Sequence, residues 1–252
     1  MKYEIFGDSK NPVIILLHGG GLSNWTWQPQ LKVWEEKYYV VAPIIDGHGA
    51  DYETTFDTIE HSANQIQQYI NENFSGKVFA IIGVSLGAQI TVEIITKAKD
   101  ICEKAVLESA LVIPMNKALV KLIVPMYSMF FPLISKKWFA KISAYYYYIP
   151  KDMFQNYFED TKRVSKKTML NMTISNSNYS LPTTFKDNKA KLLILCAKKE
   201  PSIVRKSAKL LHSVASESTL KEIKNSRHGI SLNIPQEYIE IVSAFFETEL
   251  DQ

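Results

Sequence analysis

Residues 77–99 read KVFAIIGVSLGAQITVEIITKAK, and this stretch decides the fold class. Its first part, 77–85, is a nearly continuous apolar run, which predicts a strand buried on both faces. Its second part, 86–99, predicts a helix, and Gly83-Val84-Ser85-Leu86-Gly87 forms a G-x-S-x-G pattern where the two meet. A serine on such a strained turn projects its hydroxyl outward, while small flanking residues let neighbouring backbone pack closely. Ser85 is therefore a candidate nucleophile, and the alternative is a tight turn with an incidental serine.

Further apolar runs and expected helices lie before and after residues 77–99 along the chain. Apolar runs of strand length occupy 13–18, 38–45, 104–110 and 191–197, and helices are expected over 57–73, 202–215 and 235–249. Asp57 with Glu60 predicts a capping box for the first of these helices. Alternating buried strands and helices are typical of a doubly wound, mostly parallel α/β sheet.

One segment interrupts this alternation. Residues 112–190 contain no convincing buried strand and predict short helices broken by Pro114, Pro125, Pro132, Pro150 and Pro182. We therefore expect a core of 1–111 and 191–252 with a helical cap, 112–190, inserted between two strands. Residues 112–191 hold 13 Lys and Arg against 4 Asp and Glu, together with 14 of the 29 aromatic residues and six of the seven methionines.

Composition excludes several classes of protein. The 252 residues are 46% hydrophobic and 22% charged, as in ordinary globular domains, and the net charge is +3 with both signs interspersed, which argues against a nucleic-acid partner. The start, MKYEIFGDSK, has no apolar signal region, and no run of about 18 apolar residues occurs, so we expect a cytoplasmic protein without integral membrane association. Cys102 and Cys196 each lie in an apolar run and suit buried thiols better than a metal site. The oligomeric state is unknown from sequence.

A second pattern, His18-Gly19-Gly20-Gly21, follows the first apolar strand. Consecutive glycines allow backbone N–H groups to point into a site, where they can hold an oxyanion. The alternatives are a flexible turn or a phosphate loop, but both glycine-rich phosphate-binding patterns are absent.

A serine nucleophile needs a base, and the base needs an orienting carboxylate. Of the five histidines, His228 alone lies in a loop between the last strand-like stretch, 219–224, and the final helix, which favours it as the base. Glu200 follows the apolar run 191–197 and lies between Ser85 and His228 in chain order. Glu108, at the end of the preceding strand, is the competing acid.

In these patterns the chain resembles the α/β-hydrolase superfamily over essentially its full length. The resemblance implies Ser85 as nucleophile, His228 as base, Glu200 as acid, and the amides of Gly20 and Leu86 as the oxyanion hole. We also assign substrate binding to Gly21, to Trp25, which looks like the aromatic residue common after HGGG, and to Met126 and Phe130 of the insertion. The chain departs from the usual P-D-x-R-G-x-G pattern at 43–49, and it has Ala197 and Glu200 where glycine and aspartate are usual.

The resulting expectation is a serine hydrolase that cleaves a carboxylic ester of a small to medium apolar acyl group, with no metal and no organic cofactor. The same residues would suit a carbon–carbon bond hydrolase, a thioesterase or a perhydrolase. A ligand-binding or sensing protein on a hydrolase scaffold is the alternative from another class, because fold does not fix function.

Overall fold

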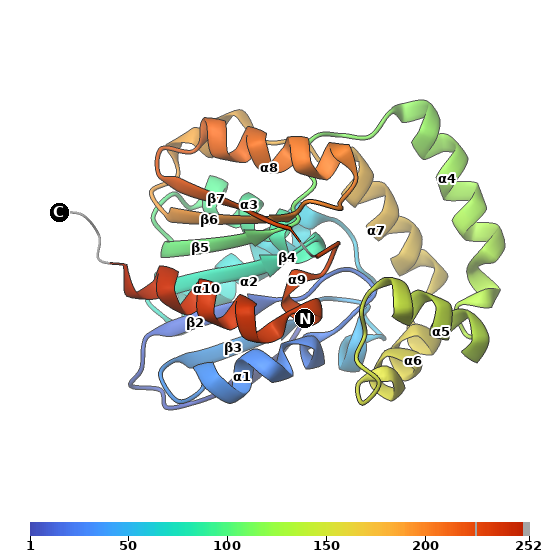
Figure 1. Cartoon of the computed structure of the whole chain (residues 1–252), viewed down its shortest axis with the longest axis horizontal. Coiled ribbons are helices and arrows are strands. Elements are labelled where there is room, and N and C mark those ends of the chain that lie inside the picture. Colours follow the sequence, from blue (N-terminus) through green and yellow to red (C-terminus); the bar gives the residue numbers. More distant parts are fainter. Residues whose placement is uncertain (225, 249–252) are drawn as a thin grey trace.

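The computed structural model describes residues 1–224 and 226–248 and contains one seven-stranded sheet (Figure 1). Its strands are β1 (Lys2–Phe6), β2 (Val13–Leu17), β3 (Tyr39–Ile44), β4 (Val78–Val84), β5 (Cys102–Glu108), β6 (Lys191–Ala197) and β7 (Ser218–Ile223). They lie in the order β1-β3-β2-β4-β5-β6-β7. Every neighbouring pair is parallel except β1 with β3, which is antiparallel. The predicted doubly wound, mostly parallel sheet is confirmed.

Helices cover both faces of this sheet (Figure 1). The helices of the core are α1 (Gln28–Trp34), α2 (Ile59–Asn73), α3 (Leu86–Lys97), α8 (Ser202–Val214), α9 (Ile230–Asn233) and α10 (Pro235–Glu247), with the 3-10 helices η1 (Asn24–Trp27) and η2 (Gly49–Asp51). Ile14 and Leu16 of β2 pack with α1 and α10, whereas Ile15 and Leu17 pack with α2, α3 and α8. Successive strand residues point to opposite faces, so a strand covered on both sides must be apolar throughout.

Two details of the core differ from the sequence-based expectations. The helix expected from residue 57 begins at Ile59, and the hydroxyl of Thr58 caps it by accepting a hydrogen bond from the His61 amide, so the Asp57 and Glu60 capping box is wrong. The edge strand β1 was not predicted. Only one face of it packs on the protein, so KYEIF has no continuous apolar run.

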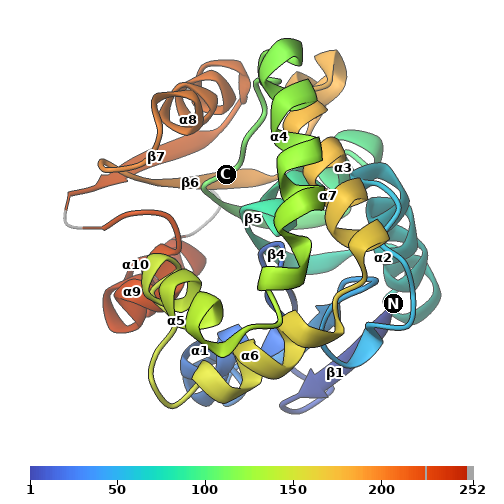
Figure 2. The same ribbon diagram turned by 90° about the vertical axis from the view of Figure 1, so that its right-hand side faces the viewer.

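The chain between β5 and β6 forms a helical insertion, as predicted. It comprises α4 (Lys117–Phe130), η3 (Phe131–Leu133), α5 (Lys137–Tyr146), α6 (Phe154–Arg163), α7 (Lys166–Asn178) and η4 (Thr183–Asp187). Figures 1 and 2 show α4 to α7 beyond the end of the sheet where β5 leads into the insertion. Pro125 does not break a helix there, contrary to expectation, but lies inside α4. Its side chain is exposed, so the backbone carbonyl of Lys121 that it leaves without a helical partner is near water.

No helix in residues 1–224 and 226–248 combines the length and the apolar character that crossing a bilayer requires.

The central strands should dominate the stability of the fold. Leu16 is fully buried between the sheet and the α1–α10 layer, so Leu16→Ala should lower the free energy of unfolding by about 2–5 kcal/mol through lost burial and a cavity. Val33→Ala on α1, where 40% of the side chain's surface is exposed, should change it by less than about 0.5 kcal/mol. Urea unfolding followed by circular dichroism measures both, and equal effects would contradict this account of the core.

Candidate active site

Ser85 occupies a sharp turn between β4 and α3. Its backbone has φ +53° and ψ −111°, a conformation that is rare for a residue with a side chain. A side chain at Gly83 would collide with the carbonyl of Gly87, and one at Gly87 would collide with the carbonyl of Leu17 in β2. The two glycines of the motif therefore let α3 begin directly against the sheet. The partly exposed Ser85 side chain lies at the carboxyl end of β4.

The glycine loop after β2 lies beside this turn. A Cβ atom built on Gly19 would be 3.8 Å from the Cβ of Ser85, and one built on Gly20 would be 3.4 Å from the Leu86 side chain. The Leu86 amide is in the first turn of α3, where N–H groups have no partner within the helix. The Gly20 amide donates to no backbone acceptor in the described part of the chain. Both amides are thus available beside Ser85.

His18 fixes the shape of this loop. Its Nε2 accepts a hydrogen bond from the Ile45 amide at 3.1 Å, so its Nδ1 carries the proton and donates to the Gly19 carbonyl at 2.9 Å. Complete burial lowers the pKa of His18 to about 3, and the ring stays neutral. This histidine therefore has a structural task in holding the loop.

His228 lies against the Glu200 carboxylate. The distance from its Nδ1 to Oε1 of Glu200 is 3.4 Å, and the Glu200 side chain is fully buried. Glu200 follows β6, and His228 lies in the loop between β7 and α9, so two strand ends bring the pair together. Gly229 has φ +89°, and this left-handed turn begins α9 directly after the histidine.

The competing acid, Glu108, makes other contacts. Its two carboxylate oxygens accept hydrogen bonds from the amides of Ile230 at 2.6 Å and Ser231 at 3.3 Å, at the start of α9. Complete burial raises the pKa of Glu108 to about 7, although these amides and His228 favour its charged form. Glu108 therefore holds the segment that follows His228, while Glu200 faces the imidazole itself.

These carboxylates set the protonation of His228. Burial alone would lower the pKa of the imidazole, but the hydrogen bond and charge of Glu200, together with the charge of Glu108, outweigh burial and raise it above its usual value of 6.5. The His228 imidazole therefore loses its proton at a higher pH than a free histidine does.

Sequence reasoning missed three side chains at this site. The Ser109 hydroxyl donates a hydrogen bond to Oε1 of Glu200, and the Cys196 thiol lies 3.4 Å from Oε2 of the same carboxylate. Ser109 follows β5 and Cys196 is the last residue but one of β6, so both lie at the carboxyl ends of adjacent strands, and that placement could have revealed them. Met172 of α7 covers Gly20, because a Cβ at Gly20 would lie 2.6 Å from its sulfur. No spacing in the sequence indicates this contact.

The residues predicted to bind substrate are spread over two regions. Gly21 has φ +74° and open space around its Cα, beside the Gly20 loop. Trp25 donates from Nε1 to Oδ2 of Asp160 at 2.7 Å, and this bond joins η1 to α6 of the insertion. Met126 and Phe130 lie on α4 with 45% of their surface exposed, so neither is enclosed in a pocket. Their roles in binding stay predictions.

A polar hollow of about 580 Å³ lies elsewhere, between the start of α2 and the end of α7. Its most buried carboxylate, Glu93, already accepts a hydrogen bond from the Tyr179 hydroxyl at 3.0 Å and pairs with Lys97 at 3.1 Å. Among the described residues, no group of three or more His, Cys, Asp or Glu side chains could hold a metal ion.

Comparison with known proteins agrees with the observed fold. A family model described as the alpha/beta hydrolase family matches residues 14–241. The chain belongs to the alpha/beta hydrolase family. No curated protein matches its sequence.

Solved structures of this alpha/beta hydrolase fold match the chain over nearly its whole length. A bromoperoxidase from Bacillus anthracis superposes with a TM-score of 0.83 at 18% identity, covering 98% of this chain and 95% of that one. An esterase from Exiguobacterium antarcticum gives 0.82 at 17% identity, covering 98% and 95%. An enol-lactonase from Burkholderia xenovorans LB400 gives 0.82 at 14% identity, covering 98% and 96%. At these identities the likeness establishes the fold alone.

The contacts of His228 predict how its protonation responds to each carboxylate. In the wild-type protein its imidazole should titrate above 6.5, and Glu200→Gln should lower that pKa by removing the hydrogen-bonded charge. Glu108→Gln should lower it less, because Glu108 acts only through its charge. NMR titration of labelled histidine, assigned with a His228→Gln variant, measures these values. A larger effect of Glu108→Gln would contradict the observed pairing.

Proposed function

We propose that the chain is a serine hydrolase that cleaves a carboxylic ester through an acyl-enzyme. The observation that carries this proposal is the buried Glu200 carboxylate against Nδ1 of His228, at the same end of the parallel strands as the strained Ser85 turn. A histidine held in this way presents Nε2 as a proton acceptor for a serine hydroxyl. The order Ser85, Glu200, His228 and the family membership of the chain support the same assignment.

Each group has one task in the proposed reaction. His228 takes the hydroxyl proton while Oγ of Ser85 attacks the ester carbonyl, and the amides of Gly20 and Leu86 hold the resulting oxyanion. The tetrahedral intermediate collapses, the protonated imidazole gives its proton to the leaving alkoxide, and an alcohol departs. A water molecule then gives a proton to His228 and attacks the acyl-enzyme; when the second tetrahedral intermediate collapses, the imidazolium returns that proton to Oγ of Ser85 and the carboxylic acid is released. Glu200 stabilises the imidazolium that forms twice in this cycle.

The acyl group is proposed to lie under the insertion, which then acts as a cap. Met172 already lies over Gly20, and methionine side chains adapt to irregular apolar ligands. Gly21 would leave room beside the oxyanion, and Trp25 would hold the cap to the core through Asp160. Met126 and Phe130 would reach the substrate only if α4 moved toward the sheet.

The first test is nucleophile replacement with a series of p-nitrophenyl esters. Ser85→Ala should lower kcat by several orders of magnitude, on the order of 10⁶ if Ser85 and His228 act as a unit. A fluorophosphonate should label Ser85 and no other residue, as mass spectrometry can show. The matched control is Ser213→Ala on the exposed side of α8, which should keep both the activity and the labelling of the parent.

Several outcomes of that series separate the alternatives. The proposal would be contradicted if Ser85→Ala lowered the rate of ester hydrolysis by less than tenfold. Labelling without turnover would favour a binding or sensing protein. Thioesters, carbon–carbon substrates and peracid formation are tested beside the esters, and the highest kcat/KM identifies the bond. Rates that rise from acetyl to medium chains would support an apolar acyl pocket, each buried CH₂ adding up to about fourfold.

The second test ranks the two carboxylates. Glu200→Gln should lower kcat by up to about 10⁴, because the imidazole loses its orienting charge. Glu108→Gln should cost far less, since its amide oxygen can still accept a hydrogen bond from the Ile230 amide. The acidic limb of kcat/KM should also move to lower pH in Glu200→Gln, as its lowered His228 pKa requires. The opposite ranking would assign the acid to Glu108.

A further inference from the structure

The outer helices of the insertion, α4 and α5, carry apolar side chains that face solvent. On α4 these include Leu119, Leu122, Met126 and Met129, whose spacing of three and four residues places them on one side of the helix. Leu122 and Met129 are 68% and 67% exposed. Most side chains of this size are covered in a soluble domain, and a continuous exposed stripe of them marks an interaction surface.

Helix α5 repeats the arrangement. Trp138, Ile142 and Tyr145 follow one another at four and three residues, and Tyr145 is 85% exposed. Its opposite side carries Ala140 and Ala144, which pack against Tyr157 of α6. The apolar side of α5 is therefore not needed to hold the insertion together.

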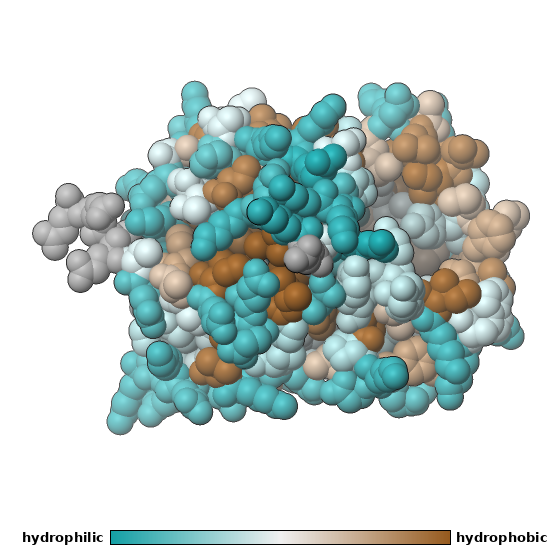
Figure 3. Space-filling model, viewed as in Figure 1, coloured by the Kyte–Doolittle hydropathy of each residue, from teal (hydrophilic) through white to brown (hydrophobic). Residues whose placement is uncertain are grey.

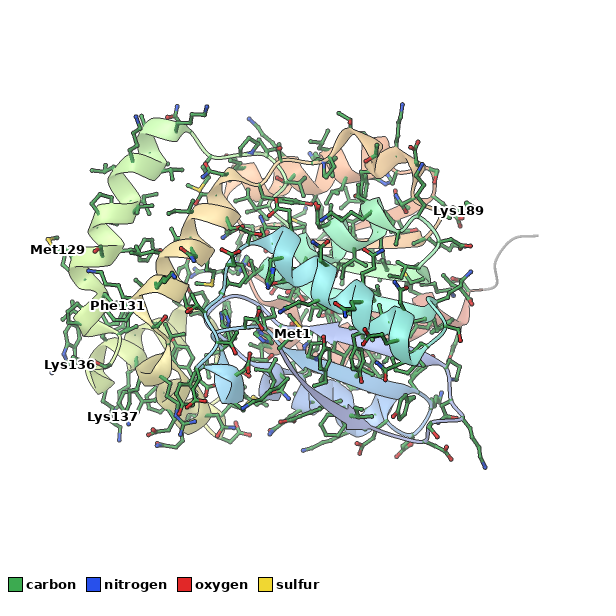
Figure 4. The ribbon with its side chains drawn as sticks, turned by 180° about the vertical axis from the view of Figure 1, so that it is seen from behind. Met1, Met129, Phe131, Lys136, Lys137 and Lys189 are labelled. Carbon is green, nitrogen blue, oxygen red and sulfur yellow. The ribbon has the colours of Figure 1, made fainter. Side chains whose placement is uncertain are left out.

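Both helices lie at the same end of the molecule. Figure 2 looks onto this end, and α4 and α5 are in front of the sheet there. In Figure 4 the side chain of Met129 points away from the body of the protein, and Lys136 and Lys137 lie along the same outer edge. Figure 3 shows hydrophobic residues gathered where α4 lies.

The charge on the segment that carries α4 and α5 has a single sign. Residues 109–151 contain six lysines, at 117, 121, 136, 137, 141 and 151, and no aspartate or glutamate. By helical spacing, Lys137 and Lys141 border the apolar stripe of α5 along one side. An apolar stripe bordered by lysines and rich in Trp and Tyr matches the region of a bilayer where acyl chains meet headgroups.

We propose that the surface of α4 and α5 docks on an anionic lipid bilayer, lying in the headgroup region without crossing it. A second copy of this chain fits less well, because a symmetric contact would bring the six lysines of one copy against those of the other. A bilayer of anionic lipid supplies both the apolar layer and the negative charge. Docking does not depend on the proposed ester chemistry, since none of Ser85, Glu200 and His228 belongs to this surface.

Such docking would orient the site toward the lipid. The turn after α5 approaches the base, because a Cβ at Gly229 would lie 3.7 Å from the carbonyl oxygen of Tyr147. The helices that would touch the bilayer thus lead directly to the loop that holds His228. A substrate arriving from the lipid would meet the insertion before it meets the core.

The test is cosedimentation with vesicles, using full-length Ser85→Ala so that no lipid is cleaved. The protein should bind vesicles containing phosphatidylglycerol, bind pure phosphatidylcholine weakly, and dissociate as salt is raised. Lys136→Glu with Lys137→Glu should lower the partition constant at least about 25-fold, taking about fivefold for each lysine. Leu122→Ser with Met129→Ser should lower it more than about tenfold through lost apolar burial.

A matched variant controls for net charge. Lys186→Glu with Lys189→Glu makes the same change in charge, and Figure 4 shows Lys189 at the opposite end of the molecule. This control should bind almost as the parent does, and circular dichroism verifies that all variants are folded. Equal loss in the control, equal binding to neutral vesicles, or no binding at all would overturn the proposal. So would dimers in sedimentation velocity that Leu122→Ser with Met129→Ser abolishes, because a second copy would then occupy the surface.

Discussion

The close contact between α3 and the sheet at Gly83 and Gly87 is the constraint on which the site depends. Neither position has room for a Cβ atom, so α3 begins directly against β2 and β4. The approach forces Ser85 into a backbone conformation that few side-chain-bearing residues adopt. The surrounding buried strands hold that conformation, since Ser85 also donates its amide to the Glu108 carbonyl at 2.8 Å. The candidate nucleophile and the central strands are thus parts of one packed structure.

Two glutamates at neighbouring strand ends divide the support of His228. Glu200 faces the imidazole, and its rotamer is held by the Ser109 hydroxyl and the Cys196 thiol. Glu108 holds the start of α9, so it fixes the backbone that follows the histidine. Both carboxylates favour the charged ring, Glu200 through direct contact and Glu108 through its charge alone, and Glu108 also fixes the position of the loop. Because β5 and β6 are adjacent and parallel, their carboxyl ends deliver both groups to the same point.

The sequence was sufficient for features that depend on local pattern. Continuous apolar runs identified the buried strands, and the G-x-S-x-G turn located Ser85 between β4 and α3. The edge strand β1 was not predicted, because one face of it is solvated. Pro125 was expected to break a helix, but its outward position lets α4 continue. The contact of Ser109 with Glu200 joins residues 91 positions apart, and Met172 is still farther from Gly20 along the chain. Only the folded arrangement of strands and insertion brings such pairs together.

The insertion differs from the core in how far its apolar side chains are covered. In the core, apolar side chains are enclosed by two layers of helices, whereas α4 has only Val120 among its fully enclosed residues. Bonds at the base of the insertion, such as Trp25 with Asp160 and the Asn171 amide with the Phe56 carbonyl, attach it to the core. Its outer helices are left with apolar surface that the protein itself does not cover. A segment attached at its base and uncovered at its tip can change its outer contacts while the Ser85 site keeps its geometry.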